Sequence, residues 1–145
     1  MKVLVDTCVW SLSLRRRKGA VGWNNEEQRL SAALAEAIRD GRVAMVGPVR
    51  QELLSGIADP QQFERLRDTL DAFADEPLTT PTYVEAARLD NLCRRRGVQC
   101  GEVDMLLCAV ALEHGWTILT NDAGLLRCIE AIEAEHPKPG HRLRG

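Results

Sequence analysis

The sequence has few aromatic residues, few histidines and no surplus of positive charge, and each shortage excludes a class of function. Aromatic residues make up 4% of the chain, so base stacking cannot be its main mode of contact with nucleic acid. Its 19 lysines and arginines are outnumbered by 21 aspartates and glutamates, which excludes a generally basic nucleic-acid binder and leaves only a local basic surface. The sequence contains no G-x-x-x-x-G-K-[ST] motif, so a phosphate-loop nucleotide enzyme is also excluded.

Long hydrophobic runs are absent as well. No apolar stretch approaches the ~18 residues that a membrane-spanning helix requires. The apolar residues 3–5 are followed at once by Asp6, a pattern that is not typical of a secretory signal. We therefore expect a cytoplasmic protein without a membrane segment.

The five cysteines form an odd number, and no two of them are spaced as C-x-x-C. With only three histidines in the chain, this pattern does not favour a zinc site. We expect reduced thiols, in keeping with a cytoplasmic location. Cys8 and Cys108 fall in apolar helical stretches and are predicted to be small core residues.

The length and composition predict one globular domain over residues 1–145. The chain is 45% hydrophobic and 28% charged, and 145 residues can bury a core without metals or cross-links. The tail after about residue 134 contains Pro137, Pro139 and Gly140 and is weakly specified. Residues 142–144 are predicted either to pair as an edge strand or to fray.

Short apolar runs alternate with helical patterns along the chain. Strands are predicted at residues 3–5, 43–46, 77–80 and 116–119. Helices are predicted from Thr7 onward and at 24–40, 48–56, from 59, at 80–97 and at 102–112. Strands that alternate with helices favour an α/β fold with a mainly parallel sheet covered on both faces.

Four carboxylates are predicted to lie at one edge of this sheet. Asp6 and Asp122 each follow a predicted strand, Glu52 lies early in the helix after residues 43–46, and Asp104 lies in the first turn of the helix at 102–112. Ligands of open α/β sheets bind beyond the carboxyl ends of the strands. Each acid by itself could be a helix cap or a solvated surface residue, but four of them at matching positions favour a shared site.

Asp104 is the most informative of the four because the helix around it is apolar nearly all round. Burial of a carboxylate in such surroundings costs several kcal/mol, and a helix amino end returns only roughly 0.3–1 kcal/mol. A divalent cation would be sufficient, and clustered carboxylates suit Mg²⁺ or Mn²⁺. Glu102 is left out of the set because residues two apart on a helix do not share a face.

The same segments resemble the PIN-domain ribonucleases and, among them, the VapC-type toxins of type II toxin–antitoxin (VapBC) systems. The resemblance covers residue 3 to about residue 126 and rests on VDTCVW (5–10), RQELLSG (50–56), RRRG (94–97), GEVDMLLCA (101–109) and LTND (119–122). Such toxins commonly continue after the last aspartate with an acid and phenylalanine, whereas this chain has Ala123, Gly124 and Leu125.

The resemblance implies a PIN-like three-layer α/β/α sandwich and a Mg²⁺- or Mn²⁺-dependent endoribonuclease. It further implies a homodimer whose acidic groove is occupied by a small antitoxin protein. Carried over by position, the metal-binding catalytic acids are Asp6, Glu52, Asp104 and Asp122. Thr7, Thr120 and Asn121 match neighbouring polar positions that would support them.

A working hypothesis for the chemistry follows. Asp6 and Asp104 hold one ion, and Glu52 and Asp122 either complete its shell or hold a second. Water then attacks the RNA phosphodiester in line and, as the resemblance implies, leaves a 5′-phosphate and a 3′-hydroxyl. An acidic pocket repels the RNA backbone, so the phosphate contacts are assigned to Arg15, Arg16, Arg94, Arg95 and Arg96. Either arginine run could instead be a solvated helix face.

Three other functions were weighed. An aspartyl-phosphate phosphatase needs a second acid two residues after the first, where this chain has Cys8. A PIN-domain nuclease of RNA processing that is not a toxin, and a PIN-like module that binds RNA or protein without cleaving it, both stay open.

Overall fold

The computed structural model describes residues 1–15, 22–135 and 143–144. Its sheet has three short parallel strands, β1 (Val3–Val5), β2 (Val43–Ala44) and β3 (Thr117–Leu119), in the order β2-β1-β3. In the register, Val3 pairs with Val43 on one side and with Thr117 on the other. The central strand therefore ends at the same edge as its neighbours, and the chain leaves that edge at Asp6.

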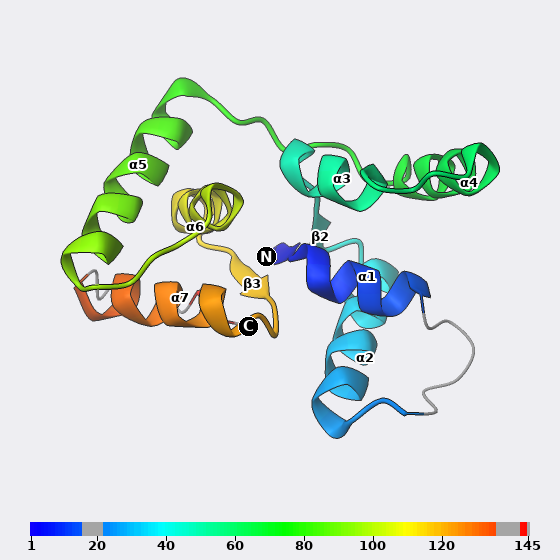
Figure 1. Ribbon diagram of the computed structural model, residues 1–145, viewed down its shortest axis with the longest axis horizontal. Helices are drawn as coiled ribbons and strands as arrows, with labels where there is room; N and C mark the ends of the chain where they lie inside the picture. Colours follow the sequence, from blue (N-terminus) through cyan, green and yellow to red (C-terminus); the bar gives the residue numbers. More distant parts are fainter. Residues whose placement is uncertain (16–21, 136–142, 145) are drawn as a thin grey trace.

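Seven helices in the described residues surround the sheet. They are α1 (Thr7–Arg15), α2 (Asn25–Arg39), α3 (Gly47–Leu54), α4 (Pro60–Leu70), α5 (Thr80–Arg95), α6 (Glu102–His114) and α7 (Ala123–Glu135). Figure 1 shows α1–α4 gathered on one side of the sheet and α5–α7 on the other. The predicted α/β fold with a parallel sheet is confirmed.

Helix α6 lies at the centre of its layer, as its apolar sequence requires. Leu107, Cys108 and Val110 are fully buried in it, and it packs along α5. On the other side of the sheet, Trp10 of α1 packs edge-on against Phe73 with ring centroids 5.2 Å apart. The core thus continues from one helical layer through the sheet to the other. It fixes the start of α1, directly after Asp6, and the first turn of α6, which carries Asp104.

Two strand predictions require correction. Residues 76–79 form no strand, although Asp75 makes an isolated parallel bridge with Met45. Pro77 has no backbone N–H to donate to a ladder, and the single bond from the Glu76 N–H to the Met45 carbonyl, 2.7 Å, completes the pairing. The predicted strand at 43–46 accordingly shortens to two residues.

The predicted edge pairing near the end of the chain is present in the part that the structure describes. Arg144 forms an isolated parallel bridge with Ile118, and the Ile118 N–H donates to the Leu143 carbonyl at 2.6 Å. Leu143 is buried. No helix in the described residues is long and apolar enough to cross a membrane.

The expectation that all thiols are reduced is wrong for one pair. Cys100 and Cys128 form a disulfide across 28 residues of sequence. The bridge joins the segment just before α6 to the middle of α7. Cys93 and Cys108 are free and buried, so the prediction that Cys108 is a core residue is confirmed, whereas Cys8 is only half-buried.

Candidate metal centre

Asp6 is the most firmly held of the predicted acids. It follows β1 directly, and its side chain is buried, at 7% exposure. Its Oδ1 accepts the Thr7 N–H at 2.8 Å, and its Oδ2 accepts the Thr120 hydroxyl at 2.8 Å and the Cys8 thiol at 3.4 Å. These donors fix the carboxylate in one orientation at the edge of the sheet.

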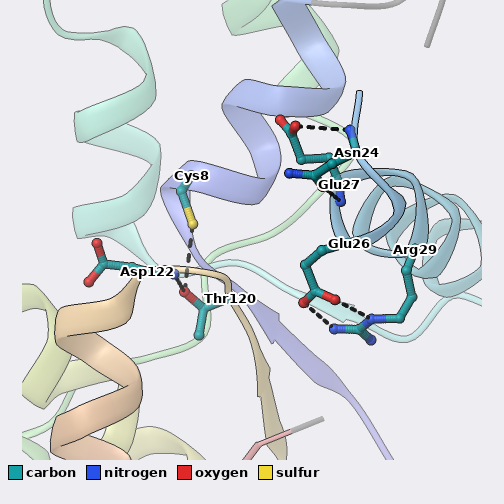
Figure 2. A network of polar contacts seen from close by, with 7 residues as sticks. All are labelled: Cys8, Asn24, Glu26, Glu27, Arg29, Thr120 and Asp122. Atoms are coloured by element: carbon teal, nitrogen blue, oxygen red, sulfur yellow. Dashed lines mark hydrogen bonds and ion pairs between the residues drawn. The ribbon is translucent and has the colours of Figure 1, made fainter. Parts of the chain in front are cut away.

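Asp122 enters the site on the loop between β3 and α7. Its backbone N–H donates to Thr120 Oγ1 at 3.0 Å, and its Oδ2 accepts the Leu125 N–H at 2.8 Å. The first bond is visible in Figure 2, where Thr120 lies between Cys8 and Asp122. Thr120 is buried. Its hydroxyl group accepts the Asp122 N–H and donates to Asp6, so a single hydroxyl group connects the two residues. Asn121 is exposed beside it.

Glu52 reaches the site from α3. Its side chain is exposed, yet its Oε2 accepts the Thr7 hydroxyl at 2.6 Å. Because the Thr7 N–H donates to Asp6, one residue at the start of α1 orients both carboxylates. The predicted supporting position of Thr7 thus has a physical basis in two hydrogen bonds.

Asp104 lies in the first turn of α6 and carries the strongest electrostatic sign of a shared site. Burial, followed by the charges of Asp6, Asp122 and Glu52, raises the pKa of Asp104 from its ordinary value of 3.8 to about 6. A hydrogen bond from the Gly101 backbone acts in the opposite direction. Each of the other three acids contributes to this shift, so each of them lies close enough to Asp104 to repel it.

The donor chemistry of this group fits a hard divalent cation. Carboxylate oxygens are what Mg²⁺ and Mn²⁺ take from proteins, and a cation would relieve the repulsion that raises the pKa of Asp104. In the described parts of the chain, however, no three acidic, histidine or cysteine side chains already form a ready-made coordination group. The acids that the sequence predicts share one electrostatic field, and binding would require them to move closer together.

The predicted arginine contacts lie farther from the acids. Arg94 pairs with Asp90 at 2.8 Å, and Arg96 pairs with Glu135 at 3.3 Å. Glu135 ends α7, whereas Asp122 directly precedes that helix, so these arginines lie toward its opposite end. Arg95 is exposed. Arg15 is the last residue of α1, and Arg16 lies outside the described residues.

Sequence reasoning missed Gly124 and Arg127. A Cβ at Gly124 would lie 3.1 Å from Asp122 Oδ2 and 4.0 Å from Arg127 Nη2, so the glycine leaves space between the acid and the guanidinium group. Arg127 is exposed and has no ion-pair partner within residues 1–15, 22–135 and 143–144.

Cys8 packs against the core, as predicted, but is only partly buried. Its thiol in addition lies 3.6 Å from Thr120 Oγ1 and donates to Asp6. Burial raises the pKa of the Cys8 thiol, and the charge of Asp6 raises it further. The thiol is therefore protonated and available as a donor at the centre of the site.

The family model described as PIN domain matches residues 3–129. One similar solved structure is entitled "Crystal Structure of FitAcB from Neisseria gonorrhoeae"; it superposes with a TM-score of 0.68 at 22% identity, over 87% of this chain and 91% of that chain. At this identity the likeness is one of fold. A search of curated proteins by sequence gives no match.

Proposed function

The chain belongs to the PIN-domain family, and on that premise we propose that it is a divalent-metal-dependent endoribonuclease and the toxin of a toxin–antitoxin pair. The observation that carries the proposal is the pair of threonines that connect three of the acids, because Thr7 bonds to Asp6 and Glu52 and Thr120 bonds to Asp6 and Asp122; the raised pKa of Asp104, to which the same three acids contribute after burial, agrees with it. A folded domain that keeps three acids near a fourth, Asp104, which they repel, gains nothing from this arrangement unless a cation binds there.

In the proposed reaction the side chains of this centre have distinct tasks. Mg²⁺ or Mn²⁺, when bound, supplies charge neutralisation at the scissile phosphate and a lower pKa for a coordinated water. Asp6 and Asp104 would hold the ion, with Glu52 and Asp122 either completing its shell or holding a second one. Thr7 orients Asp6 and Glu52, and Thr120 orients Asp6 and Asp122, through the bonds described above.

RNA affinity must come from cations around this acidic edge. Arg127 is the first candidate, because its guanidinium group and the Asp122 carboxylate flank the same glycine, Gly124, and it has no acidic partner in the described residues. Arg95 and Arg15 are further candidates, whereas Arg94 and Arg96 would first have to leave Asp90 and Glu135. The proposed phosphate contacts therefore begin at Arg127 and extend to the arginine runs.

The antitoxin, the homodimer and the cytoplasmic location belong to the same proposal. A groove of about 730 Å³ lies between α1, α4 and the end of α3, with Leu14, Leu53 and Leu66 in its lining. The acids themselves do not line this groove, but Leu53 of its lining follows Glu52 on α3, so a small protein bound there would contact the helix that carries one of them. That position supports inhibition by an antitoxin.

The test is cleavage of RNA by the purified protein with Mg²⁺, with Mn²⁺ and with EDTA, for the wild type, Asp104→Asn and Glu102→Gln. Glu102 is a matched control because it is an exposed acid in the same helical turn. Cleavage should require metal, fall at least about 100-fold in Asp104→Asn and persist in Glu102→Gln.

Two outcomes would contradict the proposal. Full activity of Asp104→Asn would remove the acids from the chemistry, and no cleavage by the wild type with either metal would favour a binding module. Expression of the wild type should also arrest growth, with relief by Asp104→Asn. Cleavage without toxicity would instead identify a nuclease of RNA processing.

A further inference from the structure

The thiol of Cys8 connects the two loops that carry the acids of the proposed metal centre. Cys8 is the second residue of α1, and its thiol donates to Asp6 Oδ2 at 3.4 Å. The sulfur lies 3.6 Å from Thr120 Oγ1 and accepts a hydrogen bond from the Asn121 backbone. Figure 2 shows the side chain pointing from α1 toward Thr120 and the start of α7.

The two carboxylate oxygens of Asp6 accept different numbers of hydrogen bonds. Two donors, the Thr120 hydroxyl and the Cys8 thiol, occupy Oδ2, and a carboxylate oxygen has about two lone-pair sites. Oδ1 accepts only the Thr7 N–H among the bonds found in the described residues. One lone pair of Oδ1 is therefore left for a cation.

We infer that Cys8 is a positioning residue of the metal centre: with Thr120 it occupies Oδ2 of Asp6 and so leaves Oδ1 for the ion, and it packs against the same Thr120 hydroxyl that accepts the Asp122 N–H. This inference rests on the proposed function, because it concerns the same centre. It assigns to Cys8 no contact with RNA and no contact with the ion.

A thiol suits this task for two physical reasons. Its long bonds and large sulfur span the gap between Asp6 and Thr120, at 3.4 and 3.6 Å, where a hydroxyl would need shorter contacts. It is also a weak donor, so it withdraws little charge from the carboxylate that has to attract the cation. Serine should preserve the donor and lose some of the reach, whereas alanine removes both.

The test measures Mn²⁺ affinity by electron paramagnetic resonance of the free ion, without RNA, for the wild type, Cys8→Ala, Cys8→Ser and Cys93→Ala. Cys93 is the matched control because it is a free buried thiol on α5. We expect about tenfold weaker binding in Cys8→Ala, the lower end for partners that orient metal ligands. Cys8→Ser should recover to within about threefold of the wild type, and Cys93→Ala should lose thermal stability with unchanged affinity.

Each alternative result has a definite meaning. Equal Mn²⁺ affinity in Cys8→Ala and the wild type overturns the positioning role and leaves the proposed function intact. Affinity in Cys8→Ser as weak as in Cys8→Ala overturns the hydrogen-bonding role. No saturable Mn²⁺ binding by the wild type overturns the proposed function, and the role of Cys8 with it. Should Cys8→Ala not fold, Cys8→Val, which restores volume without a donor, takes its place with the same expectation.

Discussion

The two sides of the acidic edge are built on different principles. On the β1 side, Asp6 is buried and accepts hydrogen bonds from Thr7, Thr120 and Cys8. On the α6 side, Asp104 receives a bond only from the Gly101 backbone among the interactions found around it, and burial and three neighbouring acids raise its pKa to about 6. One carboxylate is surrounded by hydrogen-bond donors, and the other lies half-buried among like charges.

Because of this difference, Asp6 contributes to the stability of the folded protein, whereas Asp104 reduces it. The hydrogen bonds to Asp6 make its charge part of the folded structure, since a buried carboxylate with its donors satisfied contributes to stability. Asp104 instead costs stability that no contact in the described residues returns. A cation bound between the two carboxylates would restore that stability. For this reason Asp104, rather than Asp6, indicates the function.

The first prediction tests the contrast between Asp6 and Asp104 by removing the charge of each in turn. In EDTA, Asp6→Asn should lower the free energy of unfolding by about 2 kcal/mol, because the amide cannot accept from all three donors. Asp104→Asn should raise it by about 1 kcal/mol, because the repulsion disappears and partial solvation keeps the gain small. Urea denaturation measures both, and changes of the same sign would contradict the contrast.

The second prediction uses pH to isolate Asp104. Its folded pKa of about 6 lies above its ordinary value of 3.8, so the folded state binds more protons than the unfolded state between these values. The contribution of Asp104 to the free energy of unfolding of the metal-free protein should therefore fall as pH rises from about 4 to 6. The difference between the wild type and Asp104→Asn should grow by about 1 kcal/mol over this window.

Saturating Mg²⁺ is the control for this pH dependence. A bound cation lowers the pKa of a carboxylate, so the wild type with Mg²⁺ should no longer lose stability over the same window. A pH profile shared by the wild type and Asp104→Asn in EDTA would show that Asp104 is not strained in the folded state.

The third and smallest effect concerns the cations around the acids. In EDTA, Arg127→Ala should weaken RNA binding about threefold and reduce the slope of affinity against salt by about one, as expected for one phosphate contact. Arg94→Ala is the matched control, because Arg94 already pairs with Asp90. Fluorescence anisotropy with labelled RNA at several salt concentrations measures both, and an unchanged slope in Arg127→Ala would exclude it from the phosphate contacts.

The order of elements and the chain positions of the acids could be predicted from local pattern. Residues 3–5 and the apolar helix that begins at Glu102 are short-range signals, and they place Asp6 and Asp104 at one end of a parallel sheet. The run at residues 77–80 was misjudged because its threonines suggest a strand, while Pro77 removes a donor and Thr80 begins α5.

The parts that could not be predicted depend on contacts between segments distant in sequence. The pairing of Cys100 with Cys128 depends on how α7 packs beside the start of α6, and an odd number of cysteines does not define it. The direction of the Cys8 side chain is fixed by Thr120, 112 residues away. The approach of Asp122 and Arg127 to the same space beside Gly124 depends on the absence of a side chain at that glycine.

The most direct test of the shared centre is a crystal structure of the protein grown with Mn²⁺, with the ion located by its anomalous scattering. We predict an ion that contacts Asp6 Oδ1 and a carboxylate oxygen of Asp104, at about 2.0–2.2 Å as is usual for small hard cations. Density that is absent from this edge, or an ion bound elsewhere while Asp6 and Asp104 stay apart, would contradict the claim that these acids exist to bind one cation.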